Sequence, residues 1–196
     1  MQGHSRILAT IWNRNRAEED QQHVAVLCRA THEAHRFEFK DLRAYLLCPL
    51  AANICKVSGS KRKYSDLRVG YLGASTGAGA ALMAAAELPG VVSTVVSRGG
   101  RPDLAKDALD AVRAPTLLIV GGDDKPVISM NREALAKLNC PDKKLVIIPG
   151  ATHLFEEPGT LEEVARVAAE WFSRHFKSAQ KPQVQSARVA KRLGLA

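Results

Sequence analysis

The sequence predicts a single α/β domain with a mostly parallel sheet, because apolar runs typical of buried strands alternate with segments of helical spacing. The expected strands, in chain order, are 69–72, 91–97, 115–120 and 144–148, and the expected helices are 78–88, 130–138 and 161–176. Strands that are covered on both faces read as continuous apolar runs, as residues 115–120 do. Small and polar residues follow these strands, at the ends where open α/β sheets place their ligands.

The last expected helix is amphipathic. Its apolar face, which we expect to lie against the sheet, consists of Leu161, Val164, Val167, Ala168, Trp171 and Phe172. Thr160 followed by Glu163 predicts a capping box at the start of this helix. His175 lies at helical spacing among aromatic residues near its end, so we expect this histidine to be structural.

Charge and pattern divide the chain into three parts. Residues 1–66 are a divergent part of the same domain, in which 7–12 is the expected strand and 37–54 the expected helix. Residues 67–176 form the regular α/β half, which is expected to be catalytic. Residues 177–196 hold five basic and no acidic side chains, and such a tail is typically solvated and disordered. Attraction of nucleic acid or of a membrane surface to the tail is the open alternative, although no aromatic residue is interleaved to stack on bases.

Composition argues against several classes of protein. The chain has a net charge of +8 and no apolar run near the roughly 20 residues of a membrane span. Its start lacks the apolar middle and small-residue cleavage site of a signal peptide, so we expect a cytoplasmic protein with no membrane partner. The four cysteines share no C-x-x-C spacing and lack clustered histidines, which argues against a zinc site and a disulfide framework.

The pattern Gly73-x-Ser75-x-Gly77 follows the first expected strand and opens a helix-favouring run of small residues. This setting predicts a nucleophile elbow, a tight strand-to-helix turn that lifts a serine hydroxyl clear of the sheet. Glycines flank the serine because the turn leaves no room for side chains. The free N–H groups at the helix start, that of Thr76 first among them, would bind an oxyanion formed at the serine. The alternative is a serine that only forms the turn.

A serine hydroxyl needs a base to take its proton and an acid to orient that base. The third expected strand is followed by Gly-Gly-Asp123-Asp124, and the fourth by Pro-Gly-Ala-Thr-His153. Both loops follow the serine in the chain order Ser, Asp, His that accompanies a nucleophile elbow. This order predicts His153 as the base and one of the two aspartates as the acid. The alternatives are aspartates that end a strand or cap a helix, and a histidine bonded to a carbonyl.

Arg98 and Arg101 follow the second expected strand, at the same edge of the sheet. A guanidinium matches a carboxylate or a phosphate with two hydrogen bonds, so both arginines are candidate substrate-binding residues. The equally weighted alternative is an ion pair with a nearby acidic residue, Asp103, Asp107 or Asp110.

The chain from residue 67 to about 176 resembles the dienelactone hydrolase-like branch of the α/β-hydrolases, and is similar to bacterial members that are often joined to a phosphoribosyltransferase domain. The segments that carry the resemblance are 70–77, 95–104, 114–124 and 149–158. It implies a three-layer α/β-hydrolase-like sandwich, with Ser75 as nucleophile, Asp124 as acid and His153 as base. The best-known members use cysteine as the nucleophile, so their lactone specificity does not carry over to a serine.

The N-terminal part departs from this family, because the first strands of the sheet and the loop that gives a second oxyanion N–H are not found in it. The leading hypothesis is hydrolysis of a small-molecule ester, thioester or lactone through an acyl-enzyme, with no metal or organic cofactor. The other hypothesis is a non-catalytic or impaired remnant that acts as a binding module. An incomplete sheet edge leaves strand groups unpaired. Three explanations stay open at this point: a truncated or degraded gene product, a second copy of the chain or a partner domain that covers the edge, and a missing part that is encoded elsewhere.

Overall fold

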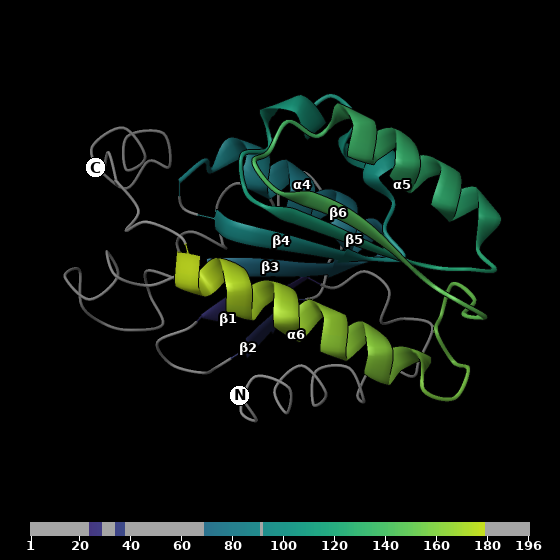
Figure 1. The fold of residues 1–196 in the computed structure, drawn as a ribbon. Helices are drawn as coiled ribbons and strands as arrows, with labels where there is room; N and C mark the ends of the chain where they lie inside the picture. Colours follow the sequence, from purple (N-terminus) through teal and green to yellow (C-terminus); the bar gives the residue numbers. More distant parts are fainter. Residues whose placement is uncertain (1–23, 29–33, 38–68, 91, 179–196) are drawn as a thin grey trace.

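The structure, a computed structural model, describes residues 24–28, 34–37, 69–90 and 92–178 (Figure 1). Its strands are β1 (Val24–Cys28), β2 (Ala34–Phe37), β3 (Val69–Ala74), β4 (Val92–Arg98), β5 (Thr116–Gly121) and β6 (Lys143–Ile148). Its helices are α4 (Thr76–Glu87), α5 (Lys125–Lys137) and α6 (Thr160–Ser178), with short 3₁₀ helices η2 (Pro102–Ala105) and η3 (Leu109–Ala111). The strands form one sheet in the order β2-β1-β3-β4-β5-β6, in which β3 to β6 run parallel.

This architecture confirms the predicted α/β fold with a mostly parallel sheet. The four expected strands are β3 to β6, and the three expected helices are α4, α5 and α6. Helix α5 begins at Lys125, several residues before the predicted start, because Pro126 is tolerated in the first turn of a helix. The carboxyl ends of the four parallel strands share one edge of the sheet. Every candidate site residue lies at one of these ends or in the segment that follows it.

The N-terminal side of the sheet differs from the prediction. Two strands, β1 and β2, precede β3, the strand that leads into Ser75, and neither of them was predicted from the sequence. Strand β1 pairs antiparallel with β3 from Val24↔Gly73 to Cys28↔Val69, so β3 has a neighbour on both sides. The side of β3 that was expected to lack a neighbouring strand is therefore paired with β1. The predicted strand 7–12 and residues 38–54 of the predicted helix lie outside the described residues.

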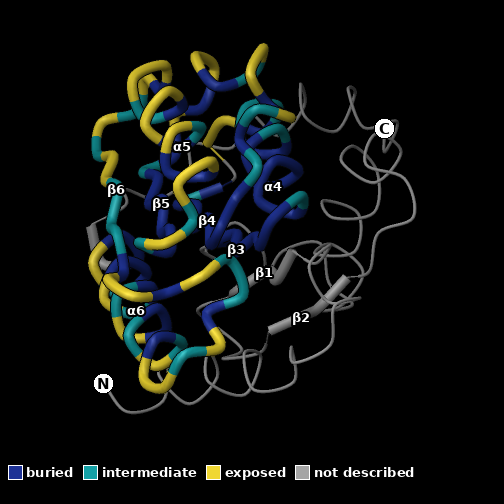
Figure 2. Tube along the Cα trace, turned by 90° about the vertical axis from the view of Figure 1, so that its right-hand side faces the viewer, coloured by how far each residue is buried: buried dark blue, intermediate teal, exposed yellow. Residues whose placement is uncertain are grey.

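The helices cover both faces of the sheet, with α6 on one face and α4 and α5 on the other (Figure 1). Alternate residues of each strand point to opposite faces. Tyr71, Val95 and Leu118 therefore pack with α4, while Leu72, Val96 and Leu117 pack with α6. Figure 2 shows that α4 is buried along most of its length, which its run of alanines and glycines permits because small side chains let the helix lie close to the sheet.

The predicted apolar face of α6 is confirmed, because Val164, Ala168, Trp171 and Phe172 belong to the core between this helix and the sheet. The Trp171 indole Nε1–H donates to Thr94 Oγ1 on β4 at 2.8 Å, which fixes the helix over the sheet. The described residues include no helix that is both long and apolar enough to cross a membrane.

The capping box predicted for α6 is wrong. The Thr160 hydroxyl donates to the backbone carbonyl of Glu157 at 2.7 Å instead of capping the helix. The Glu163 carboxylate accepts two hydrogen bonds from Arg166, at 2.6 and 2.7 Å. An ion pair one turn along the helix therefore takes the carboxylate that the box would have used.

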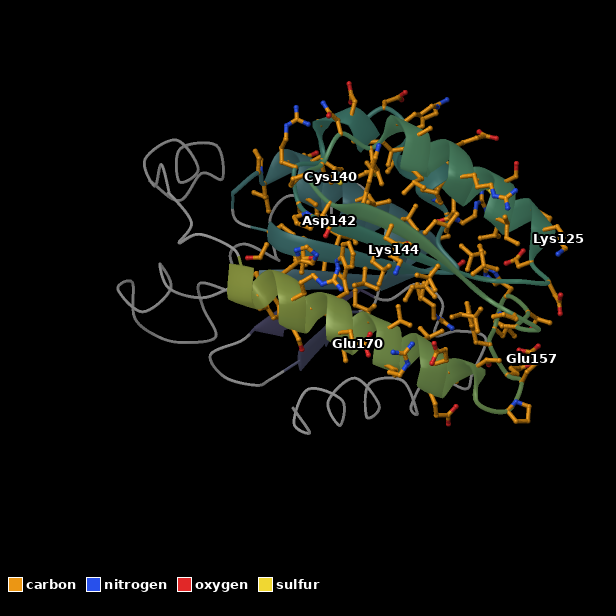
Figure 3. All side chains as sticks on the ribbon, viewed as in Figure 1. Lys125, Cys140, Asp142, Lys144, Glu157 and Glu170 are labelled. Carbon is orange, nitrogen blue, oxygen red and sulfur yellow. The ribbon has the colours of Figure 1, made fainter. Side chains whose placement is uncertain are left out.

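His175 is a structural residue, as predicted. Its ring lies 4.4 Å from the Trp171 ring between centroids, and its Nε2 lies 3.2 Å from Asp142 Oδ2. Burial of the imidazole lowers the pKa of His175, which favours the neutral ring. Asp142 precedes β6, so this contact is at the amino-terminal edge of the parallel strands, and Figure 3 shows Asp142 well away from Lys125 and Glu157 near the opposite edge.

Candidate active site

Ser75 occupies the turn between β3 and α4 in a conformation that side chains rarely adopt. Its φ of 48° and ψ of −120° place a non-glycine residue at positive φ, and its side chain does not cap α4. The Ser75 N–H donates to the Arg98 carbonyl at 3.1 Å, and the Ser75 carbonyl accepts from the Arg101 N–H at 2.9 Å. Strain of this kind at a strand-to-helix turn is the geometry of a nucleophile elbow.

Gly73 is required by space at this turn, since its own φ is not positive. A Cβ at Gly73 would lie 2.5 Å from both Ala78 Cα and the Gly77 carbonyl oxygen. These are backbone atoms of the first turn of α4, which cannot move aside as a flexible side chain could. The first glycine of the Gly73-x-Ser75-x-Gly77 pattern therefore allows α4 to start directly against its own strand.

Replacement of Gly73 with Ala should destabilise the protein by about 3 kcal/mol, because the helix start must be pushed away from β3. Urea denaturation followed by circular dichroism measures this loss. Gly90→Ala is the matched control, because Gly90 has a φ of +86° but open space around its Cβ position. That variant should lose only about 1 kcal/mol, for the backbone conformation alone. Equal losses in the two variants would contradict the steric explanation.

Asp124 and His153 are hydrogen bonded across two loops. His153 Nδ1 lies 2.6 Å from Asp124 Oδ2, and the two side chains are 33% and 11% exposed. An ionised carboxylate only accepts hydrogen bonds, so the proton of this bond lies on Nδ1, and Nε2 of a neutral ring is then free to accept a proton. Asp123 is exposed, and its backbone N–H donates to the Ala151 carbonyl at 3.0 Å. The two adjacent aspartates therefore have different environments.

Gly99 brings the histidine loop beside the turn that carries Ser75. A Cβ at Gly99 would lie 3.5 Å from His153 Cε1, and the preceding residue, Arg98, accepts the hydrogen bond of the Ser75 N–H. The Gly99 N–H donates to the Ile119 carbonyl of β5 at 2.7 Å. The segments after β3, β4 and β6 thus meet at one edge of the sheet. In the described part of the chain, no hydrogen bond joins the Ser75 hydroxyl to His153.

Glu157 supports the His153 loop and was not identified from the sequence. Its Oε1 accepts a hydrogen bond from the Thr152 backbone N–H at 3.1 Å, and this bond lowers the pKa of Glu157. Figure 3 places Glu157 in the loop before α6. The loop also approaches β5 closely, because a Cβ at Gly121 would overlap the carbonyl oxygens of Ala151 and Thr152. Thr152 and Glu157 are five positions apart, and no local pattern indicates that they pair.

The two arginines have different surroundings. Arg98 is 7% exposed; its Nη1 donates to the Leu154 carbonyl at 3.4 Å, and its guanidinium lies 5.5 Å from the centre of the Phe155 ring. Burial lowers the pKa of Arg98 to about 10, so the group stays charged at neutral pH. Arg101 donates from Nε and Nη2 to the two carboxylate oxygens of Asp103, at 2.9 and 2.7 Å. The alternative ion pair with Asp103 is thus present, and substrate binding by the arginines stays a prediction.

Among the described residues, no group of three or more histidine, cysteine, aspartate or glutamate side chains is arranged so that it could hold a metal ion. Cys140, the cysteine whose side chain is described, is half-buried and donates weakly to the Asp142 carbonyl at 3.4 Å.

Solved structures with the same fold include hydrolases of several kinds. A dienelactone hydrolase of Anabaena variabilis is 65% identical over 54% of this chain and 49% of its own, with a TM-score of 0.53. The esterase domain of a Rhodothermus marinus protein covers 86% of this chain and 81% of its own with a TM-score of 0.58. At 19% identity, that second likeness shows the fold alone.

The chain is also similar to two relatives and to the model of a family. Two Mycobacterium tuberculosis proteins, each named "Putative phosphoribosyl transferase", are 56% identical over 131 residues. The match takes up 65% of this chain but spans only 29% of the length of each relative. The model of the dienelactone hydrolase family matches residues 1–181, which is most of the sequence. With its α/β-hydrolase fold, the chain belongs to the dienelactone hydrolase family.

Proposed function

We propose that this protein is a serine hydrolase that cleaves a small-molecule ester, thioester or lactone through an acyl-enzyme, with Ser75, Asp124 and His153 as its triad. The observation that carries the proposal is the 2.6 Å bond between Asp124 and His153 at the edge of the sheet where Ser75 forms a strained turn. An imidazole held by a carboxylate and a serine set on an elbow are the parts that acyl transfer needs.

In the first half of the reaction, His153 Nε2 takes the proton of the Ser75 hydroxyl as Oγ attacks the carbonyl carbon of the substrate. The negative charge moves to the carbonyl oxygen, and the Thr76 N–H donates to it. Thr76 is the first residue of α4, and the first N–H groups of a helix have no partner within the helix. His153 then gives its proton to the leaving alkoxide or thiolate as the tetrahedral intermediate collapses to the acyl-enzyme.

In the second half, a water molecule attacks the acyl group while His153 takes its proton. The Ser75 oxygen leaves with the proton that His153 returns, and the free acid departs. Asp124 keeps the Nδ1 proton in place in both halves and stabilises the imidazolium that forms each time. The partner of this chemistry is a small acyl substrate, and the steps use only the protein's own side chains, backbone and water.

A fluorophosphonate probe tests the assignment of the nucleophile. Such probes phosphonylate an activated serine, so we expect one label per chain, which mass spectrometry of the digested protein should locate on Ser75. Ser75→Ala should take no label. A folded chain that resists the probe, or a label on a different residue, would overturn the proposal; the first result would favour the non-catalytic binding module.

A further inference from the structure

We infer that Asn131 on α5 is a positioning residue for Ser75, and this inference rests on the proposed function. Asn131 is fully buried. Its side chain reaches from α5 to Gly100, which lies between Arg98 at the end of β4 and Arg101, the two residues whose backbones bond to that of Ser75.

The hydrogen-bond partners of Asn131 determine the orientation of its side-chain amide. Its Nδ2 donates to the Gly100 carbonyl at 3.0 Å and to the Val127 carbonyl at 2.8 Å. Both partners are carbonyl oxygens that only accept, so the NH₂ group and not the amide oxygen must face them. The Val127 bond lies within α5, whereas the Gly100 bond links residues 31 positions apart.

Gly100 lies in the middle of a backbone clamp on Ser75. On one side of it, the Arg98 carbonyl accepts from the Ser75 N–H, and on the other the Arg101 N–H donates to the Ser75 carbonyl. Both peptide groups of the strained residue are therefore held by one short segment. A Cβ at Gly100 would overlap Ser97 Oγ and come within 2.7 Å of Ala78 Cβ, so the segment is also packed tightly against β4 and α4. Asn131 fixes its central carbonyl from the remaining side.

Core stability alone does not explain an asparagine at this position. Its Oδ1 is buried and has no hydrogen-bond partner among the described residues. A buried, unpaired carbonyl of this kind lowers stability, and an apolar side chain of similar size would avoid that loss. A leucine could fill the volume but could not donate to Gly100. The feature that only the amide supplies is the hydrogen bond that anchors the clamp.

The experiment compares Asn131→Leu with Ala134→Gly. Leucine keeps the volume and removes both hydrogen bonds. Ala134 is the control position because it is buried in the same helix and its methyl group cannot hydrogen bond to the clamp. Asn131→Ser is the second variant if the leucine does not fold, because a serine hydroxyl can bond to the Val127 carbonyl within the helix but is too short to reach Gly100.

Two measurements separate the positioning of Ser75 from its chemistry. Amide hydrogen exchange of the Ser75 and Arg101 N–H groups should quicken at least tenfold in both Asn131 variants, while the Thr116 N–H, bonded to Asp142, should exchange at the wild-type rate. The fluorophosphonate labelling rate and kcat for p-nitrophenyl acetate should fall about 10–100-fold with little change in KM, because a small displacement of a nucleophile affects the reacting geometry more than binding.

If the exchange rates and the labelling rate of the Asn131 variants equal those of Ala134→Gly, the inference is wrong. If wild-type protein takes no label, the proposed function fails, but the exchange measurement still decides whether Asn131 holds the Ser75 backbone. The two failures are therefore distinguishable.

Discussion

Replacement of Ser75 with Ala should reduce the hydrolysis of p-nitrophenyl acetate to the rate measured without protein. Removal of the nucleophile of a serine hydrolase lowers kcat by on the order of 10⁴–10⁶-fold, and the spontaneous reaction limits how much of that loss can be seen. The variant should fold normally, since the Ser75 hydroxyl caps no helix and makes no hydrogen bond among the described residues. Turnover is followed at 405 nm across substrate concentrations, and stability by urea denaturation.

Ser93→Ala is the matched control for this prediction. Ser93 is a partly exposed residue near the start of β4, at the opposite edge of the sheet from the proposed site. The same substitution there should leave kcat and KM unchanged within about twofold, as surface changes away from a site generally do. Turnover that survives in Ser75→Ala would assign the hydrolysis to another group or to a contaminant, and would remove Ser75 from the mechanism.

Local sequence was sufficient to predict the strand-to-helix turn at Ser75 and the parallel strands that surround it. Gly73 and Gly77 mark the turn, and the run of small residues after Ser75 indicates a helix packed close to the sheet. The apolar run that became β5 is buried along its whole length between the helices of the two faces, and such strands have continuous apolar sequences. Each of these features depends on residues that are near one another in the chain.

Features that depend on distant partners could not be predicted. Strand β1 is defined by antiparallel pairing with β3, more than forty positions along the chain, and the short apolar segment Val24–Cys28 does not indicate that partner. The bond from Asn131 to Gly100 spans 31 positions and leaves no periodic signal. The capping box failed for a related reason: the Thr160 and Glu163 side chains had other partners available, at Glu157 and Arg166.

The residues around Asp123 and Asp124 do not indicate which of the two carboxylates faces His153. Both residues follow the same strand, and the preference for Asp124 came from resemblance to a family. In the structure, the backbone N–H of Asp123 is bonded to Ala151, while the side chain of Asp124 reaches His153. Which of two adjacent carboxylates faces the histidine is set by the path of a loop, and loop paths depend on contacts that the local sequence does not show.

Asp124→Asn should lower kcat by about 10⁴-fold, which is about 5 kcal/mol of transition-state stabilisation, while KM and the fold change little. The reason is the direction of the hydrogen bond to His153. Asparagine has nearly the same shape, but its NH₂ group can donate to Nδ1 and so favour the tautomer whose proton is on Nε2. A protonated Nε2 cannot accept the Ser75 proton. Steady-state kinetics with p-nitrophenyl acetate measures the loss, and fluorophosphonate labelling of Ser75 should slow in parallel because it needs the same base.

Asp123→Asn is the control that makes this result specific, because it removes the same charge one residue earlier in the chain. Asp123 is exposed, and the hydrogen bond from its backbone N–H to Ala151 does not depend on the side chain. This variant should therefore keep kcat within about twofold of wild type, as expected for a surface substitution. A reversed result, with activity lost in Asp123→Asn and kept in Asp124→Asn, would mean that the 2.6 Å bond to His153 is not the one used in catalysis. Equal, partial losses in both variants would indicate a general effect of negative charge on the imidazolium rather than control of its tautomer.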